Sequence, residues 1–315
     1  MTEDSLNKFI NSHYALVLLG SVALLFSYIL HNTVPAEHPL MPQNTTGWLA
    51  NVATVGIAVL LLHLLNKIYA FIREYTVVHT TLFTLMLLTN PITASTLNVP
   101  VVLAIAIAVI ALILFSCFQK PDKKGRIFLA TAIPVALWPI CPSALYYLPA
   151  ILIGVIQMQV FSFKTFLAML LGAVMPLWLM YAFDLTDVTA LQFLFPDMTL
   201  DHYMAAVHAP GFGASLVALL TGMIFGAANI LKIISYRLQM RSYNGFLNIL
   251  GLVATIAIIT DISNAAPHIA VVMMLSAIQA GHFFTINKFD RNYIVFLTIT
   301  LLLLAFSVVE IFDLY

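Results

Sequence analysis

Charged residues are scarce in this sequence, and their scarcity excludes a soluble globular protein. Asp, Glu, Lys and Arg together make up 8% of the 315 residues, whereas hydrophobic residues make up 62%. A soluble domain carries roughly a quarter charged residues, because its surface faces water. The mean hydropathy of +1.01 points the same way. The composition therefore predicts a protein whose middle faces lipid.

Two further scarcities narrow the function. Ionisable side chains are nearly absent from the centres of the long apolar runs, and proton relays need such groups, which argues against a proton-driven pump. Cysteine occurs only as Cys117 and Cys141. We expect these two thiols at opposite faces of the membrane, too far apart for a disulfide. Metal-ligand spacings are also missing from the sequence, and we expect no cofactor and no metal site.

Long apolar runs, by contrast, fill the chain. A transmembrane helix needs about 20 apolar residues to cross ~30 Å of hydrocarbon. Only helices or closed barrels satisfy their backbone polar groups in lipid, and these runs are too long and too evenly apolar for barrel strands. We therefore predict an all-α fold, a polytopic transmembrane helical bundle in which residues 1–315 form a single integral membrane domain. The candidate spans are 10–30, 47–66, 74–89, 99–118, 127–140, 144–160, 164–183, 211–231, 243–261, 267–285 and 293–312.

The fifth and sixth runs are short and rich in proline. The run 127–140 would be only ~21 Å long as a helix. Prolines interrupt the pair at Pro134, Pro139, Pro142 and Pro149. Two tilted spans or a re-entrant hairpin over 127–160 both fit this pattern. Basic residues stand on both sides of the pair, so it must return to the side that it left. We predict about eleven spans, or nine if 127–160 is a re-entrant hairpin.

The charges predict an orientation for these spans. With the N-terminus inside and the spans alternating, all 13 Lys and Arg residues fall on the inner side. Of the Asp, Glu, Lys and Arg residues, the outer segments then carry only acidic ones, Glu37 and Asp201 among them. Cytoplasmic loops of membrane proteins have an excess of Lys and Arg. The sequence therefore predicts an inside N-terminus and an outside C-terminus.

The order of the runs also suggests a weak internal duplication, about 10–140 and 164–312. The first five and the last five runs share their predicted orientation and have comparable loop charges. Asn98-Val99-Pro100 and Ala265-Ala266-Pro267 open matching runs. Parallel repeats of this kind occur in transporters.

Two carboxylate–imidazole pairs in the predicted outer loops are the candidate catalytic residues. Glu37 stands beside His38, and Asp201 stands beside His202. A carboxylate next to an imidazole can act as general base on a sugar hydroxyl or form part of a metal site. Asp, Glu and His are also ordinary loop residues, and neither spacing is diagnostic. A catalytic and a purely structural role both remain open.

Polar residues inside the predicted spans cluster toward the inner ends. His63, His79 and His282 would form a polar vestibule, or a metal or haem site, if they converged. Helix ends at this depth are also partly hydrated and hydrogen bond to neighbouring backbones, which accounts for the same pattern. We favour the second interpretation, because no i, i+4 histidine pair supports a metal.

Several Pro, Gly and aromatic positions between residues 67 and 183 carry a family resemblance. They are Tyr146-Tyr147-Leu148-Pro149, Phe161-Ser162, Phe166-Leu167, Leu171-Gly172 and Pro176. This stretch resembles a family of multi-pass inner-membrane proteins of Bacteroidota that has no assigned activity, which implies a bacterial inner (cytoplasmic) membrane. More loosely, the helical layout is similar to polyprenol-dependent membrane glycosyltransferases, which place an acidic residue in the first outer loop. Glu37 occupies that loop here.

Three classes of function remain open. We favour a non-catalytic membrane subunit in cell-envelope assembly, because intramembrane polar chemistry is scarce and the loops are short. A glycosyltransferase or polymerase that acts on lipid-linked glycan at the outer face is a close alternative, and a transporter or flippase is a third. The expected partner is the lipid bilayer, with polyprenyl-linked glycan or envelope-complex subunits as further partners and no nucleic acid.

Overall fold

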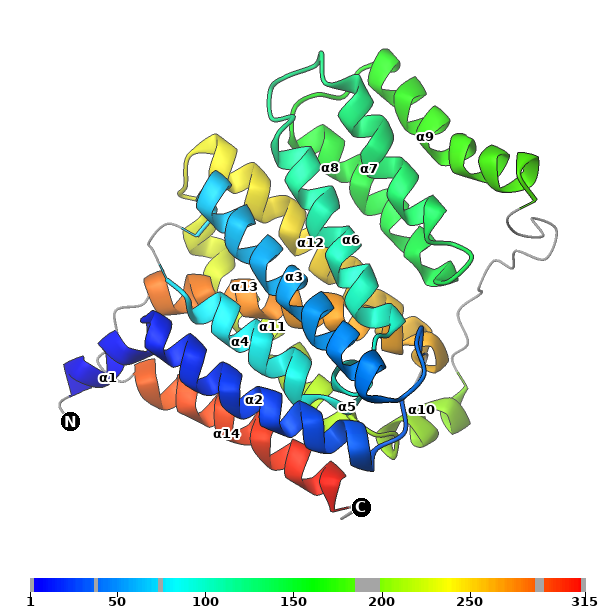
Figure 1. Ribbon diagram of the computed structural model, residues 1–315. Helices are drawn as coiled ribbons and strands as arrows, with labels where there is room; N and C mark the ends of the chain where they lie inside the picture. Colours follow the sequence, from blue (N-terminus) through cyan, green and yellow to red (C-terminus); the bar gives the residue numbers. More distant parts are fainter. Residues whose placement is uncertain (1–2, 37–38, 73–75, 185–198, 287–291, 313–315) are drawn as a thin grey trace.

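The computed structural model describes residues 3–36, 39–72, 76–184, 199–286 and 292–312 (Figure 1). Regular structure in these ranges is entirely helical, apart from one isolated β-bridge between Pro39 and Asn98. The predicted all-α class is therefore confirmed. The apolar runs predict the helices well because a long apolar segment in lipid must satisfy its backbone polar groups within itself. It therefore forms a helix whatever its packing partners are.

The helices follow the predicted runs closely. They are α1 Glu3–Ile10, α2 His13–Thr33, α3 Thr45–Tyr69, α4 Val78–Thr89, α5 Pro91–Ala94, α6 Val99–Phe115, α7 Lys124–Ala136, α8 Leu148–Gln157, α9 Phe163–Ala182, α10 Leu200–Val207, α11 Phe212–Ile233, α12 Leu238–Thr260, α13 Ala266–Ile286 and α14 Asn292–Ile311. Two 3₁₀ turns, η1 Pro142–Tyr147 and η3 Ile262–Asn264, precede α8 and α13. Helices α1, α5 and α10 are short additions outside the predicted runs.

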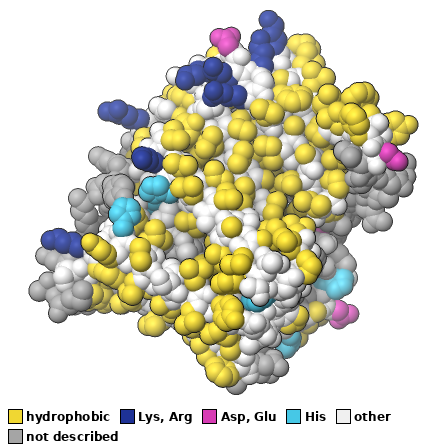
Figure 2. Space-filling view, in the orientation of Figure 1, with side chains coloured by type: hydrophobic (Ala, Val, Ile, Leu, Met, Phe, Trp, Pro, Cys, Tyr) yellow, Lys and Arg dark blue, Asp and Glu magenta, His cyan; other side chains and the backbone are white. Residues whose placement is uncertain are grey.

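Seven of the described helices are long and apolar enough to cross a membrane, namely α2, α3, α9, α11, α12, α13 and α14. The apolar segments α4, α6 and η1–α8 are shorter. Figure 2 shows a face covered mostly by hydrophobic side chains, with Lys and Arg gathered along one edge. Soluble proteins rarely expose continuous apolar surfaces of this kind. The fold is that of a helical membrane bundle.

Helix α13 is the central helix of the bundle. In its most apolar stretch 89% of the residues are buried, against at most 39% in the other six long helices. It packs against α4, α6, α11 and α12 (Figure 1). Small residues make this close packing possible. A Cβ atom on Gly222 of α11 would lie 2.2 Å from Ser276 Oγ of α13, so this glycine serves packing within the chain.

The connection between α4 and α6 is buried inside the protein. Helix α4 has 12 residues, ~18 Å, and stops at Asn90 because Pro91 lacks the N–H that would continue it. The following segment, 89–98, is rich in Thr, Ser and Asn, and nearly all of it is buried. Irregular backbone at membrane depth is stable only where protein covers it and satisfies its polar groups.

Distant segments supply those hydrogen bonds. Asn51 Nδ2 of α3 donates to the carbonyl oxygens of Thr93 and Ala94 at 2.9 and 3.0 Å. The Leu40 N–H donates to the Leu97 carbonyl oxygen at 2.8 Å. Helix α4, which lies within the predicted run 74–89, therefore leads into a turn that Leu40 and Asn51 cover.

Helices α7, α8 and α9 form a peripheral group beside α6 and α12 (Figure 1). The short proline-rich runs are two short helices, α7 and η1–α8, joined by residues 137–141. Pro134 lies inside α7, and Pro149 lies in the first turn of α8, where its missing N–H costs nothing. Cys141 of the connecting segment and Cys117 after α6 are both buried free thiols.

The Lys and Arg residues define what is termed here the basic end of the bundle. It includes Lys67 in the last turn of α3, Lys124 at the start of α7, Lys232 in the last turn of α11, and Arg237 at the N-cap of α12. In Figure 2 the dark blue side chains lie along this edge. Helices α5 and α10 lie at the opposite end (Figure 1).

Candidate functional site

Only one of the two predicted carboxylate–imidazole pairs is described. Glu37 and His38 lie outside the described residues. Asp201 and His202 occupy the first turn of α10, and both are exposed. Consecutive residues on a helix project about 100° apart, so these two side chains do not face the same point. His202 lines a pocket, and Asp201 does not.

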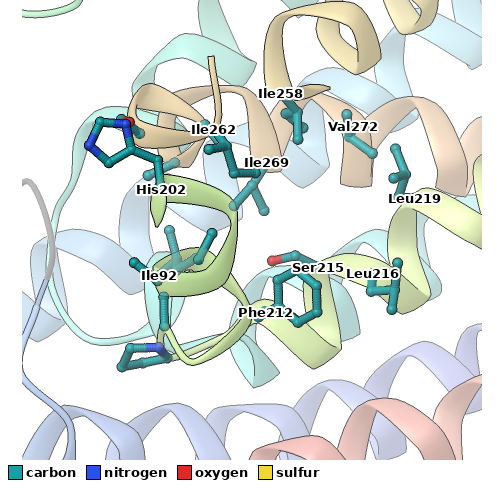
Figure 3. Close-up of a pocket in the computed structure, with 17 residues that line it drawn as sticks. Ile92, His202, Phe212, Ser215, Leu216, Leu219, Ile258, Ile262, Ile269 and Val272 are labelled. Atoms are coloured by element: carbon teal, nitrogen blue, oxygen red, sulfur yellow. The ribbon is translucent and has the colours of Figure 1, made fainter. Parts of the chain in front are cut away.

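The pocket, termed here the α10 pocket, lies between α10, α11, η3 and α13. Its volume is about 360 Å³, within the usual range for small-molecule sites. Figure 3 shows two walls that face each other, with His202 at one end. Phe212, Ser215, Leu216 and Leu219 of α11 form one wall, and Ile258, Ile262, Ile269 and Val272 form the other.

The lining of the α10 pocket is almost wholly apolar. Its polar side chains are His202, Ser215 and Ser263. The Ser215 hydroxyl donates to the Gly211 carbonyl oxygen at 2.7 Å and accepts from Asn90 Nδ2 at 2.9 Å, so it is already engaged within the protein. An apolar lining of this kind can make close van der Waals contacts with a hydrocarbon chain. It offers few polar groups that could orient a polar ligand.

A buried polar cluster fixes the wall that α11 contributes. The Gly211 N–H donates to Glu310 Oε1 of α14 at 2.6 Å, and its carbonyl oxygen accepts from Asn90 Nδ2 at 3.2 Å. Gly211 has φ +81, in the left-handed region. A Cβ atom there would also lie 2.7 Å from Asn90 Oδ1. Glycine is therefore required where α10 turns into α11, and the cluster joins α5, α11 and α14.

A second buried cluster at this end of the bundle was not predicted. Asp261 is 1% exposed and accepts from the Tyr146 hydroxyl at 3.4 Å and from Asn264 Nδ2 at 3.0 Å. The Tyr147 hydroxyl and His268 Nδ1 are hydrogen bonded at 3.0 Å. These contacts tie η1 to η3 and α13. In the sequence, two features could have indicated this cluster: the adjacent tyrosines Tyr146 and Tyr147, and the acidic residue Asp261 between two long apolar runs.

The inner histidines are deeply buried in the bundle. His79 of α4 and His282 of α13 are both 0% exposed, whereas His63 is partly buried. His282 Nε2 and Asn244 Oδ1 of α12 are hydrogen bonded at 2.6 Å. Among the described residues, no group of three or more His, Cys, Asp or Glu side chains is placed to hold a metal ion. This burial favours a packing role over an open vestibule.

Comparison with protein-family models, with curated proteins and with solved structures finds no significant match. The class of the protein therefore follows from the fold and the site alone. It is a polytopic helical membrane protein with an apolar pocket at the end of the bundle away from the basic residues.

Proposed function

We propose that this protein is a non-catalytic membrane subunit of cell-envelope assembly that holds the hydrocarbon chain of a lipid in the α10 pocket. The observation that supports this proposal is the composition of the pocket, which is apolar along both walls and has only three polar side chains among its described lining, His202, Ser215 and Ser263. A long hydrocarbon chain is the apolar ligand that a membrane supplies. Asp201 and His202, the described catalytic candidates, do not converge on one point of this pocket.

We further propose that the protein lies in the bacterial inner membrane with its basic end in the cytoplasm. The N-terminus is then inside, the C-terminus is outside, and the α10 pocket opens toward the outer face. The gathering of Lys and Arg along one edge supports this orientation (Figure 2). A reporter fused after Arg241 should be active in the cytoplasm. Activity of a periplasmic reporter at that position would reverse the orientation.

Mass spectrometry of the lipids that the gently purified protein retains tests the pocket. Ala205 lines the pocket and is exposed, so tryptophan there should fill the mouth without displacing buried neighbours. We expect Ala205→Trp to lose a retained lipid several-fold relative to the unmodified chain. Met204→Trp is the matched control, because Met204 is exposed on the same helix and does not line the pocket. Equal retention by both variants would show that the pocket is not the lipid site.

The second candidate function is a glycosyltransferase or polymerase that acts on lipid-linked glycan. The position of His202 at one end of an apolar pocket supports it, because a chain held there would bring its head group to an imidazole (Figure 3). The lipid measurement separates the two functions. An enzyme predicts a sugar-charged polyprenyl carrier whose charged fraction rises in His202→Ala. A non-catalytic subunit predicts the same charged fraction in both proteins. A transporter or flippase stays a prediction.

A further inference from the structure

Helices α11 and α12 spread apart over α13 and leave a second hollow, termed here the α11–α12 groove. Its volume is about 290 Å³. It shares Leu219 and Val272 with the α10 pocket and extends from them toward the basic end. Ile230 of α11 and Gln279 of α13 mark how far it reaches. From Phe212 to Ile230, pocket and groove together extend ~27 Å along α11, close to the thickness of a bilayer's hydrocarbon core.

Two glycines that face the groove are not needed for helix packing. A Cβ atom on Gly226 would approach Gln279 Cγ no closer than 3.8 Å, and one on Gly251 would approach Leu275 Cδ1 no closer than 3.7 Å. Both are ordinary van der Waals distances. Gly222 differs, because its Cβ would collide with Ser276. Because Gly226 and Gly251 have no side chains, the groove is open at these two positions. A larger side chain introduced at either position would fill the groove without disturbing the packing of the helices.

The groove continues into positive charge at the basic end. On α12, Arg241 lies seven residues before Asn248, which is two turns along the same helix face, ~10.5 Å away. Arg237 lies one turn further, at the N-cap of α12. Both arginines are exposed. The sequence from His202 to Thr260 has no Asp or Glu, and neither does α13. The helices that form the groove therefore place cations at its basic end without a compensating carboxylate of their own.

Asn248 supplies a hydrogen-bond donor inside the groove. Its Oδ1 accepts from Gln279 Nε2 at 2.6 Å, which fixes the orientation of the amide. Its Nδ2 makes no hydrogen bond to any residue that the structure describes. Asn248 is itself among the residues that line the groove. An amide with a spare N–H donor at this depth suits an ester carbonyl oxygen.

We propose that the α11–α12 groove binds an anionic glycerophospholipid of the leaflet at the basic end. One acyl chain fills the groove over Gly226 and Gly251, Asn248 Nδ2 donates to an ester carbonyl oxygen, and Arg237 and Arg241 bind the phosphate. Guanidinium groups match phosphate oxygens in geometry and charge. The ester carbonyl distinguishes this ligand from a polyprenyl phosphate, which has none. The proposal stands apart from the function proposed for the α10 pocket.

The test uses the full chain in vesicles of phosphatidylcholine that contain phosphatidylglycerol with a photoactivatable diazirine in one acyl chain. Labelled peptides are mapped by mass spectrometry. We expect the label to concentrate on α11, α12 and α13 around the groove. Gly226→Leu and Gly251→Leu should each lower this labelling at least several-fold. Gly56→Leu is the matched control, because a Cβ on this exposed glycine of α3 has nothing within 4 Å.

The head-group part is tested by combining Arg237→Gln and Arg241→Gln. These side chains are exposed, so folding should persist, and the double variant should lose the preference for the phosphatidylglycerol probe over a phosphatidylcholine probe with the same chain. Equal labelling by both probes in the unmodified chain would overturn the anionic head group. Label spread evenly over α2, α9 and α14 and unchanged by both leucine variants would overturn the site. Ala205→Trp should leave groove labelling unchanged, which separates this site from the α10 pocket.

Discussion

Gly211→Ala should lower the free energy of unfolding by about 2–5 kcal/mol, the sum of two costs. The first is the left-handed backbone at φ +81, which an L side chain adopts at a cost of about 1–2 kcal/mol. The second is overpacking, because the added Cβ would lie 2.7 Å from Asn90 Oδ1 and 3.1 Å from Ile92 Cγ1. Asn90 cannot simply turn away, since its Oδ1 accepts from the Ile92 N–H and its Nδ2 donates to Gly211 and Ser215. Thermal unfolding of the detergent-solubilised protein measures the loss.

Gly56→Ala is the control for Gly211→Ala, and its expected sign is opposite. Gly56 lies inside α3, is exposed, and a Cβ there meets nothing within 4 Å. Alanine in a helix interior is more favourable than glycine by roughly 0.5–1 kcal/mol. Gly56→Ala should therefore unfold at the same temperature or slightly higher. If Gly211→Ala proved as stable as Gly56→Ala, the left-handed turn before α11 would be wrong, and so would the wall of the α10 pocket that depends on it.

Gly172→Ala is expected to separate α7 from α9. A Cβ atom on Gly172 would lie 2.4 Å from the Phe128 carbonyl oxygen and 2.5 Å from Thr131 Oγ1. The Phe128 oxygen belongs to the backbone of α7, and Thr131 Oγ1 already donates to it and to the Ile127 oxygen, so neither atom moves alone. Overpacking of this kind costs about 1–3 kcal/mol, and Gly172→Leu should cost more. Thermal unfolding and protease cleavage within 137–141 measure the effect.

Gly125→Ala is the matched control for Gly172→Ala, because Gly125 lies in the first turn of α7 and a Cβ there meets nothing within 4 Å. It should leave both the unfolding temperature and the protease sensitivity unchanged. Equal behaviour of Gly172→Ala and Gly125→Ala would contradict the close approach of the two helices. The proline-rich pair would then lack its main lateral contact.

The apolar runs predict the helices because lipid imposes one requirement on every span, a long stretch without charge. The buried turn between α4 and α6 could not be predicted in this way. Its Thr, Ser and Asn residues have the composition of a surface loop, and sequence alone does not show that protein covers them. Their partners, such as Asn51 and Gly211, lie far along the chain. Local patterns therefore locate the elements and miss which polar segments are buried.

The site shows the same limit. Asp201 and His202 are adjacent in the sequence and were predicted as a catalytic pair, yet only His202 lines the pocket. The pocket itself is made of Ile, Leu, Ala and Phe side chains from five helices and a 3₁₀ turn. In the sequence these residues are indistinguishable from those that simply pack or face lipid. Glu310 stands near the end of the last apolar run, and nothing in the sequence around it indicates that its carboxylate accepts a hydrogen bond from the Gly211 N–H.

The covered turn between α4 and α6 has a consequence for biogenesis. Two of its polar groups bond to residues that the ribosome makes much later, since the Asn90 side-chain amide donates to Gly211 and the Thr89 carbonyl oxygen accepts from Ser307 Oγ. Until α11 and α14 are inserted, the Asn90 amide and the Thr89 carbonyl oxygen lack these partners, and lipid cannot replace them. Insertion of the last helix thus completes the hydrogen bonding of the first half of the protein, and we expect chains that end before α14 to be degraded faster than the full chain.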